Sequence, residues 1–208
     1  MKFINKVFHL VFKIIRNLMR LTFPTNGYAF TTDYLTHVLD IWDMYFSAFK
    51  GRDNLNILEI GSYEGRSAIW FIENLLEGKN SKLTCVDIFF SWLLEARFDH
   101  NIKQSGRHGK VIKVKASSQE ILPLLEREQY EIIYVDGSHV ADHVRSDADQ
   151  AFRLLKKGGM ICFDDYEWRP DLPKEQRPQI AIDEFLQKYQ NEISVLHKEY
   201  QVIVQKNN

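Results

Sequence analysis

Cysteine is scarce in this chain, and the shortage restricts both its chemistry and its compartment. The 208 residues include only Cys85 and Cys162, each inside an apolar run that predicts a buried strand. Two isolated cysteines lack the paired spacing of a zinc or iron–sulfur site. We expect buried free thiols rather than a disulfide, which fits a reducing cytoplasm.

An excess of charge of either sign is also absent. Lys and Arg number 27 against 28 Asp and Glu, so the formal net charge is −1. This balance gives no indication of a nucleic-acid partner. Apolar residues make up 45% of the chain and charged residues 26%, as in ordinary soluble domains. The length suits one α/β domain with a sizeable core and is short for two.

The N-terminal segment lacks an uninterrupted apolar run. Over residues 2–21, KFINKVFHLVFKIIRNLMRL, apolar residues recur with helical spacing and basic residues occupy the opposite face. Lys13 and Arg16 interrupt the run, so we do not expect a transmembrane helix. No small-residue cleavage site comes after it, so a signal peptide is not expected either. The predicted helix either lies on an anionic membrane surface, or covers the domain, or packs in a homodimer.

From residue 55 onward, strand and helix patterns alternate. Apolar runs predict strands over 55–60, 82–87, 111–114, 131–136 and 160–163, and helical spacing predicts helices over 66–76, 92–104, 119–127, 141–156 and 180–189. Gly158 and Gly159 are expected to end the fourth of these helices, and residues 193–205 predict two short strands joined by a tight turn. The alternation predicts a mostly parallel sheet with helices on both faces. Its ligand site should lie beyond the carboxyl ends of the strands.

The first strand runs into a glycine loop, which reads EIGSYEGRS from Glu59 to Ser67. Gly61 and Gly65 allow a tight turn and a close approach to a ligand, and the next helix would begin facing that ligand. The Gly-Lys-Ser or Gly-Lys-Thr of a phosphate loop is absent. Tyr63 occupies the place of the middle glycine of a dinucleotide fold. The two glycines are also compatible with ordinary turn chemistry.

Polar residues at the next two strand ends suit an adenosine. Asp87 ends the second strand, where its carboxylate can accept hydrogen bonds from both ribose hydroxyls or cap the following helix. Ser117 comes after the third strand and can contact an adenine edge or cap a helix. Together with the glycine loop, Asp87 favours an adenosine ligand.

Carboxylates gather after the fourth and fifth strands. Asp136 ends the fourth strand, and Asp164 and Asp165 come directly after the fifth. If these strands are neighbours, the three carboxylates converge and repel one another unless a cation neutralises them. Oxygen ligands suit Mg²⁺ or a similar hard ion, although each aspartate alone could cap a loop. His139 lies at the same place, and the near-neutral pKa of histidine suits a general base.

Three segments, NILEIGSYEGRSA, LTCVDIF and YVDGSHVADHVRSDADQAFRLLKKGGMICFDDY, resemble the class I S-adenosylmethionine-dependent methyltransferases. More narrowly, they are similar to the small metal-dependent O-methyltransferases related to macrocin O-methyltransferase. The resemblance covers residues 55–166. It implies a Rossmann-like, mostly parallel sheet of seven strands with an antiparallel C-terminal hairpin. Residues 1–50 lie outside the resemblance, and we expect them to form the N-terminal amphipathic helix and a substrate-side cap. Residues 51–208 would form the S-adenosylmethionine-binding domain.

The resemblance also implies roles for individual residues. The amino-acid part of S-adenosylmethionine would be surrounded by Glu59, Gly61, Tyr63, Gly65 and Ser67. Asp87 would hold the ribose and Ser117 would lie by the adenine. The metal positions are matched by Asp136, Asp164 and Asp165, and Asp136 would also border the cofactor. His139 or a carboxylate such as Asp136 would take the proton. Catechol-methylating relatives have Asp-Asn in place of Asp164-Asp165, and the extra carboxylate fits sugar-methylating relatives better.

The implied function is Mg²⁺-dependent methylation of a hydroxyl on a small molecule, sugar or glycan, by a cytoplasmic enzyme for which peripheral membrane contact is an open alternative. Aromatic residues after the second and fifth strands either stack on this acceptor or pack in the core; they are Phe89, Phe90, Trp92, Tyr166 and Trp168. Two other classes of function fit the same residues. One is an S-adenosylmethionine-binding module without methyl transfer. The other is an NAD-type oxidoreductase, against which the missing third glycine argues.

Overall fold

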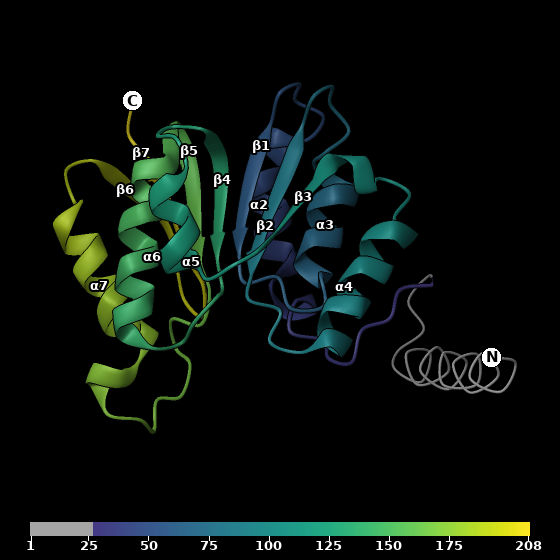
Figure 1. Ribbon diagram of the computed structural model, residues 1–208. Helices are drawn as coiled ribbons and strands as arrows, with labels where there is room; N and C mark the ends of the chain where they lie inside the picture. The colour runs from purple at the N-terminus through teal and green to yellow at the C-terminus, as the bar shows by residue number, and fades with distance from the viewer. Residues whose placement is uncertain (1–26) are drawn as a thin grey trace, which may run out of the picture.

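A seven-stranded sheet forms the centre of the structure, a computed structural model that describes residues 27–208 (Figure 1). Its strands are β1 (Asn56–Ile60), β2 (Lys82–Asp87), β3 (Val111–Lys115), β4 (Tyr130–Val135), β5 (Leu155–Phe163), β6 (Ile193–Lys198) and β7 (Val202–Lys206). They are arranged in the order β3-β2-β1-β4-β5-β7-β6. Strands β1 to β5 pair in parallel, and β7 pairs antiparallel with both β5 and β6. The predicted fold class, including the antiparallel C-terminal hairpin, is confirmed.

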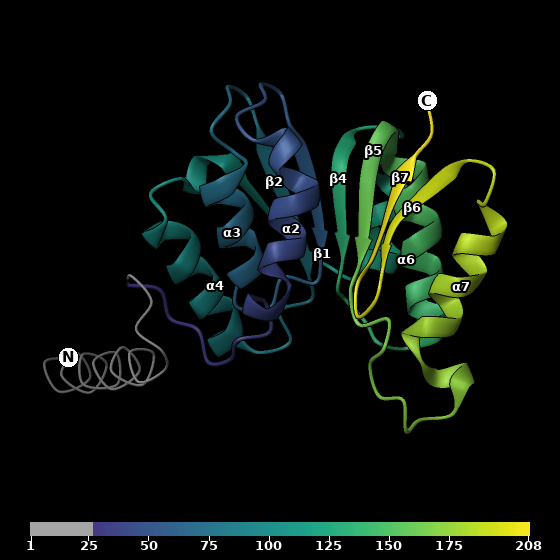
Figure 2. The ribbon, with the colours of Figure 1, turned by 180° about the vertical axis from the view of Figure 1, so that it is seen from behind.

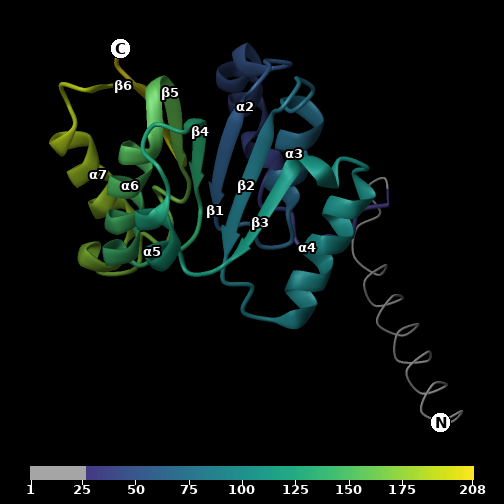
Figure 3. The same cartoon turned by 45° about the horizontal axis from the view of Figure 1, so that its top comes forward.

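Helices cover both faces of the sheet, as Figures 2 and 3 show from two further directions. One face packs against α2 (Leu39–Phe46), α3 (Arg66–Asn74) and α4 (Trp92–Gln104). The other packs against α6 (Ala141–Leu154) and α7 (Pro178–Lys188), with the short α5 (Ser118–Ile121) beside them. Neighbouring residues of β1 face opposite sides of the sheet. Ile57 belongs to the core on the side of α2, α3 and α4, and Leu58 belongs to the core on the side of α6 and α7. Burial on both sides explains why the parallel strands read as continuous apolar runs.

Several predicted helices end earlier than the sequence patterns indicated, and two of these ends affect the loops around the sheet. The helix predicted over 119–127 stops at Ile121 and continues as a 3₁₀ turn, Leu122–Leu124. Pro123 lies in that turn, and proline has no amide hydrogen with which to extend an α-helix. The helix predicted over 141–156 stops at Leu154, and β5 begins at the next residue.

Gly158 and Gly159 lie inside β5, so their predicted role as the end of a helix is wrong. The register between β4 and β5 shifts between the pairs Tyr130↔Leu155 and Ile132↔Met160, which makes a bulge. Gly158 takes up the bulge with a φ of +73°. A Cβ on Gly159 would lie 2.9 Å from the carbonyl oxygen of Glu131. The two glycines therefore allow β4 and β5 to pair closely.

The segment before β1 is part of the same core. Trp42 of α2 is fully buried, and its ring stacks on Phe71 of α3 at 4.8 Å and meets Tyr134 of β4 edge-on at 4.9 Å. Its Nε1 donates to Oε1 of Gln201 at 2.8 Å. Upstream, the buried carboxylate of Glu64 accepts from the amide and hydroxyl of Thr31. The domain division at residue 50 stays a prediction.

The predicted amphipathic helix over residues 2–21 lies outside the described residues. Within residues 27–208, no helix combines the length and the apolar character that a membrane span requires.

The loops after β1 and β4 meet at Gly61. These two strands are neighbours, and Asp136 N–H donates to the carbonyl oxygen of Ile60 at 2.8 Å. Gly61 has a φ of +86°, and a Cβ there would lie 2.0 Å from the carbonyl oxygen of Asp136. Only glycine fits such an approach. The contact fixes the glycine loop against the acidic loop that begins after β4.

We predict that Gly61→Ala lowers the free energy of unfolding by more than about 3 kcal/mol, because its methyl group meets backbone that cannot move aside. Gly106→Ala is the matched control: its φ is +70°, but nothing lies within 4 Å of the added Cβ. That substitution should cost only the left-handed backbone strain, about 1–2 kcal/mol. Urea unfolding followed by circular dichroism measures both. Equal losses in the two variants would contradict the steric account of Gly61.

Candidate active site

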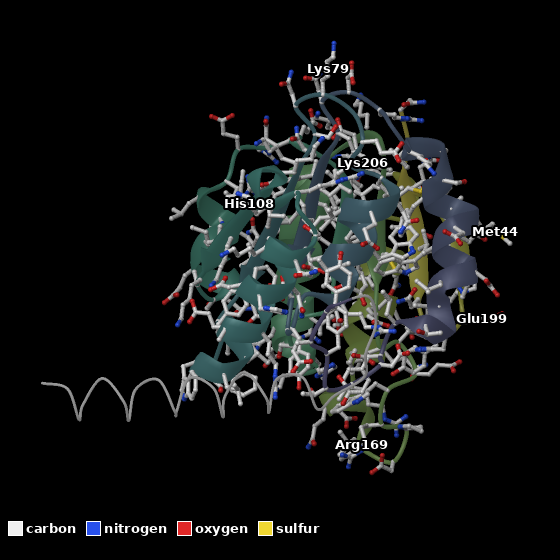
Figure 4. The ribbon with its side chains drawn as sticks, turned by 90° about the vertical axis from the view of Figure 1, so that its right-hand side faces the viewer. Met44, Lys79, His108, Arg169, Glu199 and Lys206 are labelled. Carbon is white, nitrogen blue, oxygen red and sulfur yellow. The ribbon has the colours of Figure 1, made fainter. Side chains whose placement is uncertain are left out.

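A cleft of about 1070 Å³ opens at the carboxyl ends of the parallel strands. Figure 4 shows this end by Arg169, which lies beyond β5, while Lys79 and Lys206 lie at the opposite end of the molecule. The cleft is lined by residues from the loops after four strands and from the segment after β5; among them are Gly61, Asp87, Ser117, Gln119, His139 and Trp168. A site at this edge of the sheet agrees with the rule for open α/β folds.

Asp87 joins the glycine loop to the end of β2. Its Oδ2 accepts from the amides of Ser62 and Tyr63 at 2.8 and 2.9 Å, and its Oδ1 accepts from the amide of Phe89 at 2.6 Å. The side chain that caps α4 is Ser91, not Asp87. A carboxylate has about four acceptor positions, so Asp87 can shape the loop and still accept from a ribose at the cleft.

Glu59 lies beneath the glycine loop rather than on the cleft wall. Its side chain is fully buried; Oε1 accepts from the hydroxyl of Ser67, and Oε2 has no partner among the described residues. Burial raises the pKa of Glu59 to about 7. Gly65 precedes α3 and packs on the ring of Phe98. Of the residues predicted around the amino-acid part of the cofactor, Gly61 therefore lines the cleft, while Glu59, Gly65 and Ser67 support the loop from behind.

The remaining residue predicted there, Tyr63, has a φ of +46° and is 40% exposed. It is not among the residues that line the cleft. Its backbone amide, bound to Asp87, is the part of Tyr63 that shapes the site.

The predicted adenine position includes two residues that the sequence patterns did not indicate, Gln119 and Asp147. Ser117 lines the cleft as expected, and its hydroxyl donates to Oε1 of Gln119 at 3.2 Å. The Gln119 amide donates from Nε2 to Oδ1 of Asp147 at 3.2 Å. Asp147 is 1% exposed, its Oδ2 has no partner within residues 27–208, and burial raises its pKa to about 6. One sequence signal could have identified Asp147: it is a carboxylate on the apolar face of α6, between Val144 and Ala148.

Asp136, His139 and Asp165 come together at the other end of the cleft. One ligand atom from each lies within 4.8 Å of the other two. They meet because β4 pairs with β5, which places Val135 beside Phe163 immediately before the acidic loops. The Nε2 atom of His139 lies 2.5 Å from Oδ2 of Asp165, and this contact raises the pKa of the imidazole. Trp168 stacks on the imidazole ring at 4.6 Å.

Asp164, also predicted as a metal ligand, has other contacts in the structure. Its carboxylate accepts from the hydroxyl of Tyr134 and from the amide of Asp165. The same hydroxyl lies 3.1 Å from Oδ2 of Asp136. Burial and the neighbouring carboxylates raise the pKa of Asp136 and of Asp164. Asp164 thus adds negative charge beside the Asp136–His139–Asp165 cluster without joining its ligand atoms.

Tyr200 supports the cluster from the turn between β6 and β7. Its hydroxyl donates to Oδ1 of Asp165 at 2.6 Å, and its carbonyl oxygen accepts from the amide of Tyr166. Asp165 has a φ of +58°, a conformation that costs energy for a residue other than glycine. Tyr200 helps to hold that conformation. No local pattern indicates this role, because the partners are 35 residues apart.

The buried Glu59 should make stability depend on pH. Its pKa rises from 4.5 in a solvated chain to about 7 in the folded protein, so the folded state holds the proton more tightly. Stability is then full below about pH 4.5 and decreases as the pH rises towards 7, by about 3 kcal/mol. Glu59→Gln removes this contribution and keeps the side-chain shape.

Urea unfolding at pH 5 and pH 8, with chelator and without ligand, measures the difference. The wild type should lose about 3 kcal/mol more stability over this interval than Glu59→Gln. Equal losses in the two proteins would show that Glu59 is ionised in the folded state.

Comparison with known families places a large part of the sequence in one of them. The profile of a family described as a methyltransferase domain matches residues 58–166, just over half of the chain. That range begins in β1 and ends just after Asp165, so it contains every residue assigned above to the glycine loop, Asp87 and the acidic cluster. A protein of Acanthamoeba polyphaga mimivirus, uncharacterized protein R132, is 29% identical in an alignment of 129 positions that covers 58% of this chain. The chain spans only 57% of that relative's length.

Solved structures share the fold at low sequence identity. A putative rRNA-methylase from Clostridium thermocellum has a TM-score of 0.66 at 15% identity, over 84% of this chain and all of that one. The O-methyltransferase TomG from Streptomyces achromogenes, solved with S-adenosylmethionine, also scores 0.66 at 15% identity, over 85% and 82% of the two chains. MycE from the mycinamycin biosynthetic pathway scores 0.62 at 16% identity, over 85% of this chain and 51% of its own. The chain belongs to the methyltransferase-domain family and has the class I fold of S-adenosylmethionine-dependent methyltransferases.

Proposed function

We propose that this protein transfers the methyl group of S-adenosylmethionine to a hydroxyl of a sugar-containing or other small acceptor, with a divalent cation at the acidic cluster. The observation that carries the proposal is the Asp136–His139–Asp165 cluster, because His139 lines the same cleft as Asp87 and Ser117. Groups suited to a ribose and an adenine therefore share a cleft with groups suited to deprotonating an alcohol.

The residues at the cluster fit a small hard cation. Carboxylate oxygens of Asp136 and Asp165 would hold it, and these are the ligands that Mg²⁺ prefers. A cavity of about 10 Å³ has Asp136, His139, Asp164 and Asp165 among its lining residues, which is room for about one water-sized species. Three neighbouring carboxylates also repel one another until positive charge is bound. The structure of MycE, a protein of the same fold, was solved with Mg.

The chemistry of the reaction is divided among a few groups. S-adenosylmethionine supplies a methyl group activated on a sulfonium. The cation would lower the pKa of an acceptor hydroxyl, as a Lewis acid does. His139 takes the hydroxyl proton, since Asp165 raises the basicity of its ring and Trp168 fixes the ring plane. The remaining contribution is positioning. The glycine loop and Asp87 would hold S-adenosylmethionine, and the acidic loops would hold the acceptor beside it.

A sugar hydroxyl is the acceptor that the cleft favours. Trp168 contributes an aromatic ring to the cleft wall beside His139, and Glu175 and Gln176 add polar groups to the same wall. MycE was solved with Mg, S-adenosylhomocysteine and mycinamycin VI. Two of the five aromatic residues predicted to meet substrate or core, Phe89 and Tyr166, are buried in the core.

Removal of the cation should stop turnover. We expect chelation with EDTA to reduce methyl transfer, measured as S-adenosylhomocysteine release with a panel of glycosylated acceptors, by at least about 100-fold. Mg²⁺ should restore it. Asp165→Asn should weaken Mn²⁺ binding, followed by electron paramagnetic resonance, by about 10-fold or more, and leave S-adenosylmethionine affinity by calorimetry nearly unchanged. Asp171→Asn, a carboxylate on the surface paired with Arg169, is the control. Unchanged Mn²⁺ binding in Asp165→Asn would contradict the cation site.

Asp147 should govern recognition of the purine. It holds Nε2 of Gln119, which leaves Oε1 on the side of Ser117 as an acceptor for the adenine amino group. S-adenosylhomocysteine should then bind at least about 10-fold more tightly than its hypoxanthine analogue, S-inosylhomocysteine. Nε2 of Gln119 also donates to Oγ of Ser118 at 2.9 Å, but a hydroxyl can pair with either end of the amide. Asp147→Leu therefore removes the acceptor that fixes the amide orientation, and the ratio should fall to about 3-fold or less. Asp149→Asn, on the same helix, should keep the wild-type ratio. Calorimetry with both ligands measures it, and an unchanged ratio in Asp147→Leu would refute the role.

A further inference from the structure

Three large apolar side chains are exposed to solvent on the loop after β2 and at the first residue of α4. Ile88 is 57% exposed, Phe90 74% and Trp92 65%. They lie within five residues, where the chain passes from β2 into α4, a connection that Figure 3 shows. Clustered exposed apolar side chains of this size are uncommon on a protein that acts alone in water. We call Ile88, Phe90 and Trp92 the apolar rim.

The loop itself is firmly held, so the exposure is built into the structure. Phe89, between two rim residues, is 2% exposed and packs on Phe98 with ring centroids 5.0 Å apart. The ammonium of Lys113 lies 4.7 Å from its ring. The backbone amide of Phe89 donates to Asp87, and the φ of Phe89, +44°, turns the chain sharply. Because Phe89 points inward at a fixed position, its neighbours Ile88 and Phe90 are held outward.

The rim adjoins both the cleft and a pair of tyrosines. Ile88 is one of the residues that line the cleft. Tyr63, whose amide binds Asp87, has its ring 6.5 Å from that of Tyr34, and Tyr34 is 70% exposed. Trp, Tyr and Phe are the side chains that favour the boundary between water and lipid. The composition of this surface therefore matches a bilayer surface.

The distribution of charge along the chain favours a bilayer that contains anionic lipids. Residues 1–26 contain five Lys and Arg and no acidic residue, which leaves 22 basic and 28 acidic residues in the remainder. The described part begins at Gly27, whose carbonyl oxygen lies 3.2 Å from Nε2 of His100. His100 belongs to α4, the same helix that Trp92 begins. A basic segment rich in apolar residues thus joins the body at the helix that carries the rim.

We propose that the apolar rim and residues 2–21 together dock the protein on an anionic lipid bilayer, with the mouth of the cleft beside the lipid surface. The basic residues of the segment attract the anionic headgroups, and the rim side chains enter the interface. Either contact alone is weak, because the acidic body is repelled by the same lipids that attract the segment. This docking is independent of the methyl transfer proposed above.

Co-sedimentation of the full chain with vesicles tests the proposal. The wild type should bind vesicles of phosphatidylcholine and phosphatidylglycerol and remain in the supernatant with phosphatidylcholine alone. Phe90→Ser combined with Trp92→Ser should weaken binding to the anionic vesicles by about 10-fold or more. Lys13→Glu with Arg16→Glu and Arg20→Glu should do the same, and high salt should weaken the wild type.

The matched control is Met44→Ser combined with Leu124→Ser. These side chains are 72% and 77% exposed and lie outside the rim, and Figure 4 shows Met44 on the outer side of α2. The control should bind vesicles as the wild type does, and all variants should keep their affinity for S-adenosylmethionine, which verifies the fold. Failure of the wild type to bind anionic vesicles overturns the proposal. Undiminished binding of the Phe90 and Trp92 variant overturns it as well, because the rim then plays no part.

Discussion

The structure depends on the contact between Gly61 and the carbonyl of Asp136. The order of the strands reverses between β1 and β4, so the connections from these neighbours depart in opposite directions and leave a cleft between them. Gly61 permits the two departing loops to touch. One loop carries the amides that bind Asp87, and the other carries Asp136 and His139. A single close backbone contact thus sets the distance between the cofactor half and the acidic half of the cleft.

The cofactor half and the acidic half of the cleft differ in how many hydrogen-bond donors surround their carboxylates. Around Asp87, backbone amides from three residues satisfy the carboxylate. Around Asp136 and Asp164, the main donor is the single hydroxyl of Tyr134, and the pKa of each carboxyl is raised by burial and by like charge. Asp87 is thus satisfied by backbone donors without a ligand, whereas the acidic half has more negative charge than its own donors can balance. This asymmetry is the physical basis for assigning a cation to the second half.

Local patterns in the sequence predict most of the strands and the polar loops that follow them. The features that they do not predict depend on contacts between distant parts of the chain. Apolar runs that lead into Asp87, Asp136 and Asp164 predict both the strands and the polar loops at their carboxyl ends, because the two signals lie within a few residues of each other. The helix α2 was not predicted; its burial depends on Trp42 reaching Gln201, 159 residues away. Tyr200 and Asp147 were missed for the same reason, since their partners come from other elements. The glycines of β5 were misassigned because a helix end and a strand bulge both favour glycine.

The position of Tyr200 has a consequence for how the protein is made. Tyr200 and Gln201 immediately precede β7, which is inserted between β5 and β6. During synthesis, the glycine loop, Asp87 and all three aspartates leave the ribosome well before the turn that braces Asp165. The acidic half therefore stays unsupported until β7 pairs with β5. The acidic end of the cleft is thus completed last, by the strand that is synthesised last.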